Sequence, residues 1–187
     1  MKPLLLAAAL ALCAAAPTPA RAAKVAGVEF PDRVEAGGQP LRLNGVGLRK
    51  KLFIKVYAGG LYLQEPSKDA AAIVAADAPK RVRMVFLRDV SRKQVMDAYR
   101  EGFEKNSGGP GLKDLVDKLD RIAPAIPAEL KEGAEMLVTY VPGEGTTVIS
   151  PAGKATVDGK EFADALFKNW LGEHPADDGL KKGLLGG

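Results

Sequence analysis

The chain has 187 residues, 27 of them Lys or Arg and 23 Asp or Glu, which gives a formal net charge of +4. A charge this close to zero excludes an electrostatic case for nucleic-acid binding. An aromatic content of 6% likewise argues against a surface on which bases stack.

The N-terminus has the pattern of a segment that is removed after export. Lys2 precedes the apolar run Leu4–Ala16, and Ala20-Arg21-Ala22 is a small-x-small cleavage site. The run is too short for a permanent membrane span. We therefore predict a secretory signal peptide over residues 1–22, export across the inner membrane and a periplasmic location. The only cysteine, Cys13, lies in this segment, so the remaining chain is expected to have no disulfide.

The rest, residues 23–187, is predicted to be one domain without a membrane span. Residue alternation with period two predicts strands in its first half over Val25–Phe30, Leu41–Leu48, Ile54–Gln64 and Lys80–Arg88. Gly45 and Gly47 allow the backbone to bend or something to approach closely, while Gly59-Gly60 suggests a bulge.

Helical spacing takes over in the middle of the chain. Ser91 with Gln94 forms a capping box ahead of the best helix, which ends at Asn106. Further helices are expected over Ser67–Ala76, over Leu112–Ile122, as one turn at Ala128–Glu132, and from an Asp158 cap to Gly172. Three strands, Glu135–Pro142, Gly145–Ser150 and Lys154–Val157, form a meander, and Asp177–Gly187 is a basic tail. This order predicts an α+β fold with a mostly antiparallel sheet and helices on one face.

The hairpin Leu43–Leu63 carries the candidate site. Alternation puts Phe53, Lys55 and Tyr57 on one face of its second strand. Arg49 ends the first strand, and a guanidinium beside a phenol could hold one carboxylate. The alternative is an ordinary strand pair, in which Arg49 pairs with a local acid and Tyr57 packs in the core.

Several segments together resemble the chalcone isomerase superfamily, above all its bacterial secreted members. They are N-G-V-G-L-R at residues 44–49, F-I-K-V-Y-A-G-G-L-Y-L at 53–63 and A-L-F-K-N-W-L-G at 165–172. The resemblance implies an open-faced β-sandwich in which a large antiparallel sheet and a layer of helices enclose an apolar cleft.

The resemblance also implies roles for single residues. Arg49 matches the cleft arginine, which stabilises negative charge in the isomerases and holds the carboxylate in the fatty-acid binders. Tyr57, in K-V-Y-A, matches the tyrosine of the fatty-acid-binding branch, where the isomerases have a catalytic threonine. Val95 and Gly102 stand where the isomerases have a tyrosine and an asparagine, although Tyr99 lies one turn after Val95.

The resulting hypothesis is a non-catalytic periplasmic binding protein for a fatty acid or similar apolar carboxylate, expected to be a monomer. Its predicted ligand-binding residues are Arg49, Tyr57, Phe53, Tyr99 and Phe103. One alternative is an intramolecular lyase or isomerase that uses Arg49 as electrophilic stabiliser and Tyr57 or Tyr99 as acid. Another is an envelope protein that binds a partner through an exposed tail, Leu180–Leu185. We expect no cofactor, and no metal because His174 is the only histidine.

Overall fold

The computed structural model of the protein describes residues 22–187. The predicted signal peptide, apart from its last residue, lies outside the described residues. Among residues 22–187, no helix has both the length and the apolar character needed to cross a bilayer.

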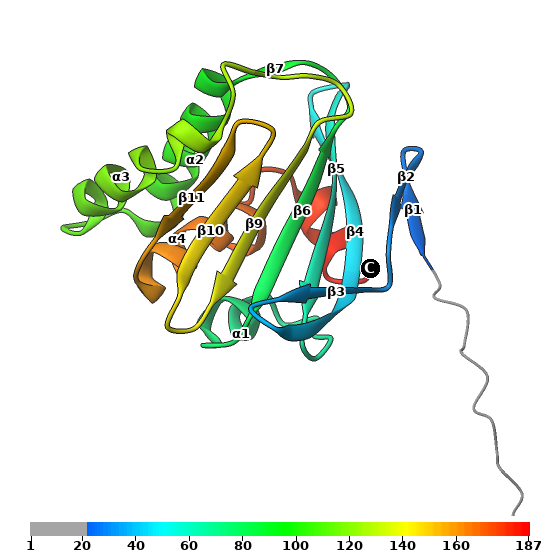
Figure 1. Cartoon of the computed structure of the whole chain (residues 1–187), viewed down its shortest axis with the longest axis horizontal. Helices are drawn as coiled ribbons and strands as arrows, with labels where there is room; N and C mark the ends of the chain where they lie inside the picture. The colour runs from blue at the N-terminus through cyan, green and yellow to red at the C-terminus, as the bar shows by residue number, and fades with distance from the viewer. Residues whose placement is uncertain (1–21) are drawn as a thin grey trace, which may run out of the picture.

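One seven-stranded sheet forms the body of the protein (Figure 1). Its strand order is β11-β10-β9-β6-β5-β4-β3, and every neighbouring pair is antiparallel. The strands are β3 (Arg33–Ala36), β4 (Gln39–Lys51), β5 (Ile54–Leu63), β6 (Lys80–Phe86), β9 (Glu135–Val141), β10 (Gly145–Ser150) and β11 (Gly153–Val157). Two small ribbons flank this sheet, β1 (Ala23–Val25) with β2 (Val28–Phe30), and β7 (Val90–Ser91) with β8 (Glu129–Leu130).

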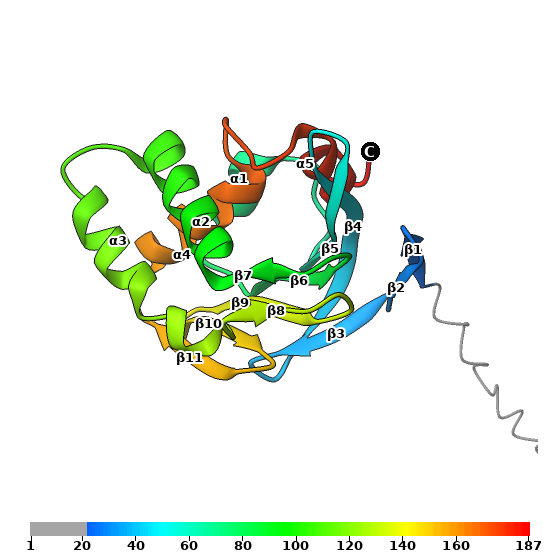
Figure 2. The same ribbon diagram turned by 90° about the horizontal axis from the view of Figure 1, so that it is seen from above.

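The sheet curls, and the helices gather inside the curl (Figure 2). They are α1 (Ala70–Ala75), α2 (Arg92–Ser107), α3 (Leu112–Asp120), the 3-10 turn η1 (Ala123–Ala125), α4 (Lys160–Leu171) and α5 (Asp178–Leu184). The predicted α+β fold, with helices on one face of an antiparallel sheet, is therefore confirmed.

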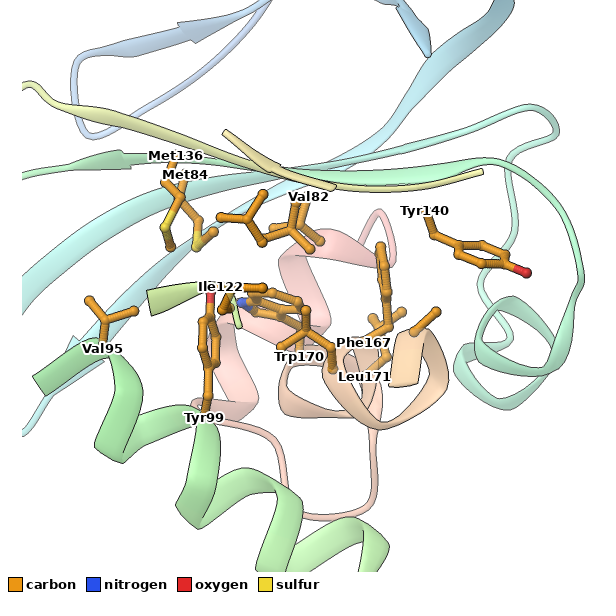
Figure 3. Packing of buried hydrophobic residues seen from close by; sticks show 14 of the residues in the cluster. Val82, Met84, Val95, Tyr99, Ile122, Met136, Tyr140, Phe167, Trp170 and Leu171 are labelled. Atoms are coloured by element: carbon orange, nitrogen blue, oxygen red, sulfur yellow. The ribbon is translucent and has the colours of Figure 1, made fainter. Parts of the chain in front are cut away.

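The core lies between the sheet and α2 and α4. Val82, Met84 and Met136 point from the sheet toward Tyr99 of α2 and Trp170 of α4 (Figure 3). The capping box predicted for α2 is present, since Ser91 and Gln94 exchange side-chain hydrogen bonds with each other's backbone N–H groups.

Three local predictions were wrong. The single strand Val25–Phe30 is the β1–β2 hairpin, because Ala26 and Gly27 both have positive φ and turn the chain back. The helical turn predicted at Ala128–Glu132 is β8, whose pairing with β7 depends on a partner distant in the sequence. Gly59-Gly60 forms no bulge.

Gly60 has a packing role instead, because a Cβ there would lie 2.5 Å from the ring of Phe30. Two helix starts also differ from prediction. Asp69 caps α1, two residues after the expected start at Ser67, and Gly159 rather than Asp158 precedes α4.

The predicted exposed tail is the helix α5, and this is a further correction. Leu180 and Leu184 are fully buried. The helix lies on β4, where a Cβ on Gly45 or Gly47 would come within 2.7 Å of an α5 carbonyl oxygen. The glycines predicted to permit close approach therefore admit the C-terminal helix.

Candidate functional site

A cavity of about 600 Å³ opens between the end of the sheet that carries the β4–β5 turn and helices α2 and α4. Its apolar wall comes from β5, β6 and β9 on one side and α2 and α4 on the other. The apolar and aromatic lining residues include Val56, Met84, Phe86, Val95, Met136 and Trp170. The volume is typical of a small-molecule site, and the wall combines this apolar part with polar and charged side chains.

Arg49 and Tyr57 lie directly opposite each other on β4 and β5, with the guanidinium carbon 5.7 Å from the centre of the phenol ring. Arg49 Nε is buried and has no hydrogen-bond partner. Among the described residues Arg49 also forms no ion pair, so the alternative in which it pairs with a local acid is not what the structure shows. Tyr57, only 6% exposed, does pack in the core as that alternative held.

The hydroxyl of Tyr57 accepts a 2.9 Å hydrogen bond from Trp170 Nε1. The indole uses a lone pair of this oxygen and leaves the phenol proton available to a ligand. Burial raises the pKa of Tyr57, against the opposing effects of Arg49 and of the indole hydrogen bond. The group therefore stays a neutral donor over the physiological pH range.

Tyr99 brings a second phenol to the cavity from α2. Its side chain is 6% exposed, and its hydroxyl has no partner among the described residues. The ring packs edge-on against Trp170, with 5.8 Å between ring centres. Burial raises the pKa of Tyr99, and Tyr57 raises it further. Two unpartnered groups, Arg49 Nε and Tyr99 Oη, are thus buried at the wall of one cavity.

Positively charged side chains outnumber negatively charged ones in the lining of the cavity. Its acids, Asp89, Asp97 and Glu101, each pair with a lysine that lies outside the lining. Its cations form no ion pair with any other residue in the 22–187 range; they are Arg49, Lys50, Lys51 and Arg88. This arrangement favours an anionic ligand.

Two of the five predicted ligand-binding residues lie away from the cavity. Phe53 is in the β4–β5 turn and is 99% exposed, because β5 begins at Ile54 and strand alternation does not extend back to residue 53. Phe103 is fully buried between α2 and α4, where its ring packs edge-on against Phe162. The structure brings Arg49, Tyr57 and Tyr99 together and leaves these two phenylalanines out.

Sequence reasoning missed the contribution of α4. Trp170 and Asn169 both line the cavity. Asn169 Oδ1 lies only 1.8 Å from where a Cβ on Gly102 would be, so the amide fills the space that Gly102 leaves open on α2. Asn169 Nδ2 donates to the carbonyls of Ala165 and Leu166. In the sequence, Gly102 stands among the buried residues of α2. A glycine at such a position was the signal that another element approaches closely there.

The described part of the chain contains no group of three or more His, Cys, Asp or Glu residues placed to hold a metal ion. The polar groups of the cavity that lack a partner within residues 22–187 are a hydroxyl and cations, which suit an organic anion.

Comparison with known proteins agrees with the fold. A family model described as chalcone isomerase-like matches residues 22–186. The crystal structure of a fatty-acid binding protein from Arabidopsis thaliana is similar with a TM-score of 0.69 and 18% sequence identity. The similarity covers 88% of this chain and 96% of the plant chain. No curated protein matched the sequence. The fold and the family match together establish that the chain belongs to the chalcone isomerase-like family.

Proposed function

We propose that this protein is a non-catalytic binding protein for a fatty acid or similar apolar carboxylate. The observation that carries the proposal is the pair of buried, unpartnered groups, Arg49 Nε and Tyr99 Oη, at the wall of a cavity that also has an apolar wall. A buried donor without a partner costs about 1–3 kcal/mol. A carboxylate bound between the guanidinium and the two phenols would remove that cost.

The cavity offers a place for each part of such a ligand. Arg49 supplies a charged fork and Tyr57 a free phenol proton, both suited to a carboxylate head. Met84, Val95 and Met136 offer an apolar wall to the tail, and methionines adapt to chains of varied shape. The name of the similar plant structure, a fatty-acid binding protein, supports the same ligand class. The periplasmic location belongs to the proposal and is supported by the signal-peptide pattern in the sequence.

The isomerase alternative has one observation in its favour, the Asn169 amide beside Gly102, where the resemblance implied that an asparagine was missing. However, the amide nitrogen of Asn169 already donates to two backbone carbonyls of α4. The raised pKa values of Tyr57 and Tyr99 also make both phenols weak acids. Cyclisation of a chalcone that depends on Arg49 would support this alternative.

Titration calorimetry with laurate tests the proposal. Arg49→Ala removes one charge-assisted contact, which is worth about 1.5–3 kcal/mol, so the affinity for laurate should fall at least about tenfold. Arg42→Ala is the matched control, since Arg42 is exposed on the same strand. 1-Dodecanol, with the same chain and no carboxylate, should bind wild type and Arg49→Ala alike. Equal laurate affinity in the two proteins would contradict the proposal.

A further inference from the structure

The turn between β4 and β5 exposes three consecutive apolar side chains. Leu52 is 86% exposed, Phe53 99% and Ile54 49%. Within residues 22–187 only one other large apolar side chain, Ile149, is classed as exposed, at 39%. An apolar cluster of this kind on a protein surface marks a contact site. We call Leu52, Phe53 and Ile54 the apolar tip.

The backbone of the tip is strained. Leu52 has φ of +57°, a conformation that glycine or asparagine adopts with less strain than leucine. Because the Leu52 side chain is exposed, it buries little apolar surface that could offset this backbone strain. Strain that does not serve the fold points to a function for the side chain.

Cations flank the tip. Lys50 and Lys51 precede it and Lys55 follows it, and all three are exposed. None of them forms an ion pair with another residue of the described chain. At the base of the turn, Asp177 accepts a hydrogen bond from the backbone N–H of Lys50. Apolar side chains with lysines around them match the interface of an anionic bilayer, where tails lie beneath phosphates.

The tip is also part of the mouth of the cavity. Lys50, Lys51 and Ile54 line the cavity. The turn itself stands at one end of the sheet (Figure 1). We propose that the apolar tip inserts into an anionic lipid bilayer, with its lysines at the lipid phosphates, and so brings the mouth of the cavity to the membrane surface. The proposal that the protein inserts into a bilayer depends only on the apolar tip. The passage of an acyl acid between bilayer and cavity rests on the function proposed above.

Co-sedimentation with vesicles tests insertion. The full protein should bind vesicles of phosphatidylcholine with phosphatidylglycerol, and bind pure phosphatidylcholine at least about tenfold more weakly. Leu52→Asn with Phe53→Ser should lower binding to the anionic vesicles at least about tenfold. Asparagine tolerates the positive φ at position 52. Ile149→Ser, which removes an exposed apolar side chain from β10, is the matched control and should bind as wild type does.

A second pair of variants tests the charges. Lys51→Gln with Lys55→Gln should weaken binding to anionic vesicles several-fold, since each lysine near such a surface contributes separately. Arg42→Gln with Lys68→Gln removes the same charge near the other end of the β4–β5 pair, where Arg42 faces Leu63, and should have no effect. In addition, the tryptophan fluorescence of the Phe53→Trp variant should shift to shorter wavelength when the protein binds anionic vesicles.

Absence of binding to anionic vesicles, or binding that Leu52→Asn with Phe53→Ser leaves unchanged, would overturn the proposal. A concentration-dependent dimer that only the tip variant abolishes, without vesicle binding, would overturn it in favour of self-association. Laurate affinity in solution separates the two proposals, because the tip variant should keep it and Arg49→Ala should lose it. If the protein binds vesicles through the tip but does not bind laurate, the insertion proposal holds and the proposed fatty-acid ligand is contradicted.

Discussion

Trp170 Nε1 donates a hydrogen bond of 2.9 Å to the hydroxyl of Tyr57, joining α4 to β5 across 113 residues of sequence. Both side chains are buried, Trp170 at 1% and Tyr57 at 6% exposure. The bond fixes the phenol beside Arg49, its partner on β4. The helix layer thus sets the orientation of a donor that the sheet supplies.

Tyr57→Phe should cost both stability and affinity. The indole N–H would be left buried without its acceptor, which costs about 1–3 kcal/mol in the free energy of unfolding. Laurate would lose one donor as well. Urea denaturation and titration calorimetry measure the two effects. Tyr62→Phe is the control, because the Tyr62 hydroxyl is already buried and unpartnered, and this change should not destabilise the protein.

A double-mutant cycle isolates the bond itself. Trp170→Phe removes the donor, so Tyr57→Phe should cost less in that background than in wild type. Equal costs in the two backgrounds would show that the hydrogen bond contributes nothing to stability.

Tyr99→Phe should separate stability from binding. The unliganded protein loses a buried hydroxyl without a partner, so its free energy of unfolding should stay the same or rise by up to about 1 kcal/mol. Laurate affinity should fall at least about tenfold, because a hydrogen bond to a carboxylate is charge-assisted and contributes about 1.5–3 kcal/mol. A variant that unfolds more easily and binds laurate normally would contradict the role given to Tyr99.

Gly102→Ala should destabilise the protein although alanine is the better helix former. The gain in helix propensity is about 0.5–1 kcal/mol. The added Cβ would lie 1.8 Å from Asn169 Oδ1, in a space with no room for it. Overpacking of this kind costs about 1–3 kcal/mol. Thermal unfolding should show a lower Tm for Gly102→Ala.

The second change in this test is Asn169→Ala, which clears the space. The cost of Gly102→Ala should be smaller in that background than in wild type. If both backgrounds show the same cost, the contact between α2 and α4 is not its cause.

The free energy of unfolding should fall steeply at alkaline pH. Burial raises the pKa of Tyr57 and Tyr99, and raises that of Tyr62 to about 12. Above pH 10 the unfolded chain releases these protons while the folded protein keeps them. The stability that these tyrosines contribute is therefore full below pH 10 and is lost as the pH rises toward the raised values.

Lys80 acts in the opposite direction at lower pH. Burial lowers its pKa to about 8, so its contribution to stability rises between pH 8 and about 10.5. Urea denaturation from pH 10.5 to 12 lies above the Lys80 range. Lys131, whose pKa is raised by Glu129 and Asp89, contributes to the decline there equally in wild type and in a tyrosine variant. Tyr99→Phe should show a shallower decline than wild type over that range, and an identical decline would contradict the assignment.

Local patterns were enough to predict much of the site. Alternation along the β4–β5 hairpin and the K-V-Y-A motif placed Arg49 and Tyr57 side by side, and the capping box of Ser91 located the start of α2. These features depend on neighbours within a few residues, which the sequence displays directly.

The missing parts depend on partners distant in the sequence. β8 is a strand only because β7 lies beside it, and Asn169 reaches the cavity only because Gly102 lies opposite. Phe53 was misplaced because periodicity does not reveal where a strand begins. Packing across the fold decided each of these outcomes, as it commonly overrides local preference.

The position of α5 has a consequence for the order of folding. The side chain of Asn44 donates a hydrogen bond to the carbonyl oxygen of Leu184, 140 residues further on. Gly45 and Gly47, which have no Cβ, allow the same helix to lie close to β4. The strand that carries Arg49 is therefore fully covered only when nearly the whole domain has been synthesised. Closing so long a loop is slow, so we expect the docking of α5 on β4 to be a late step of folding.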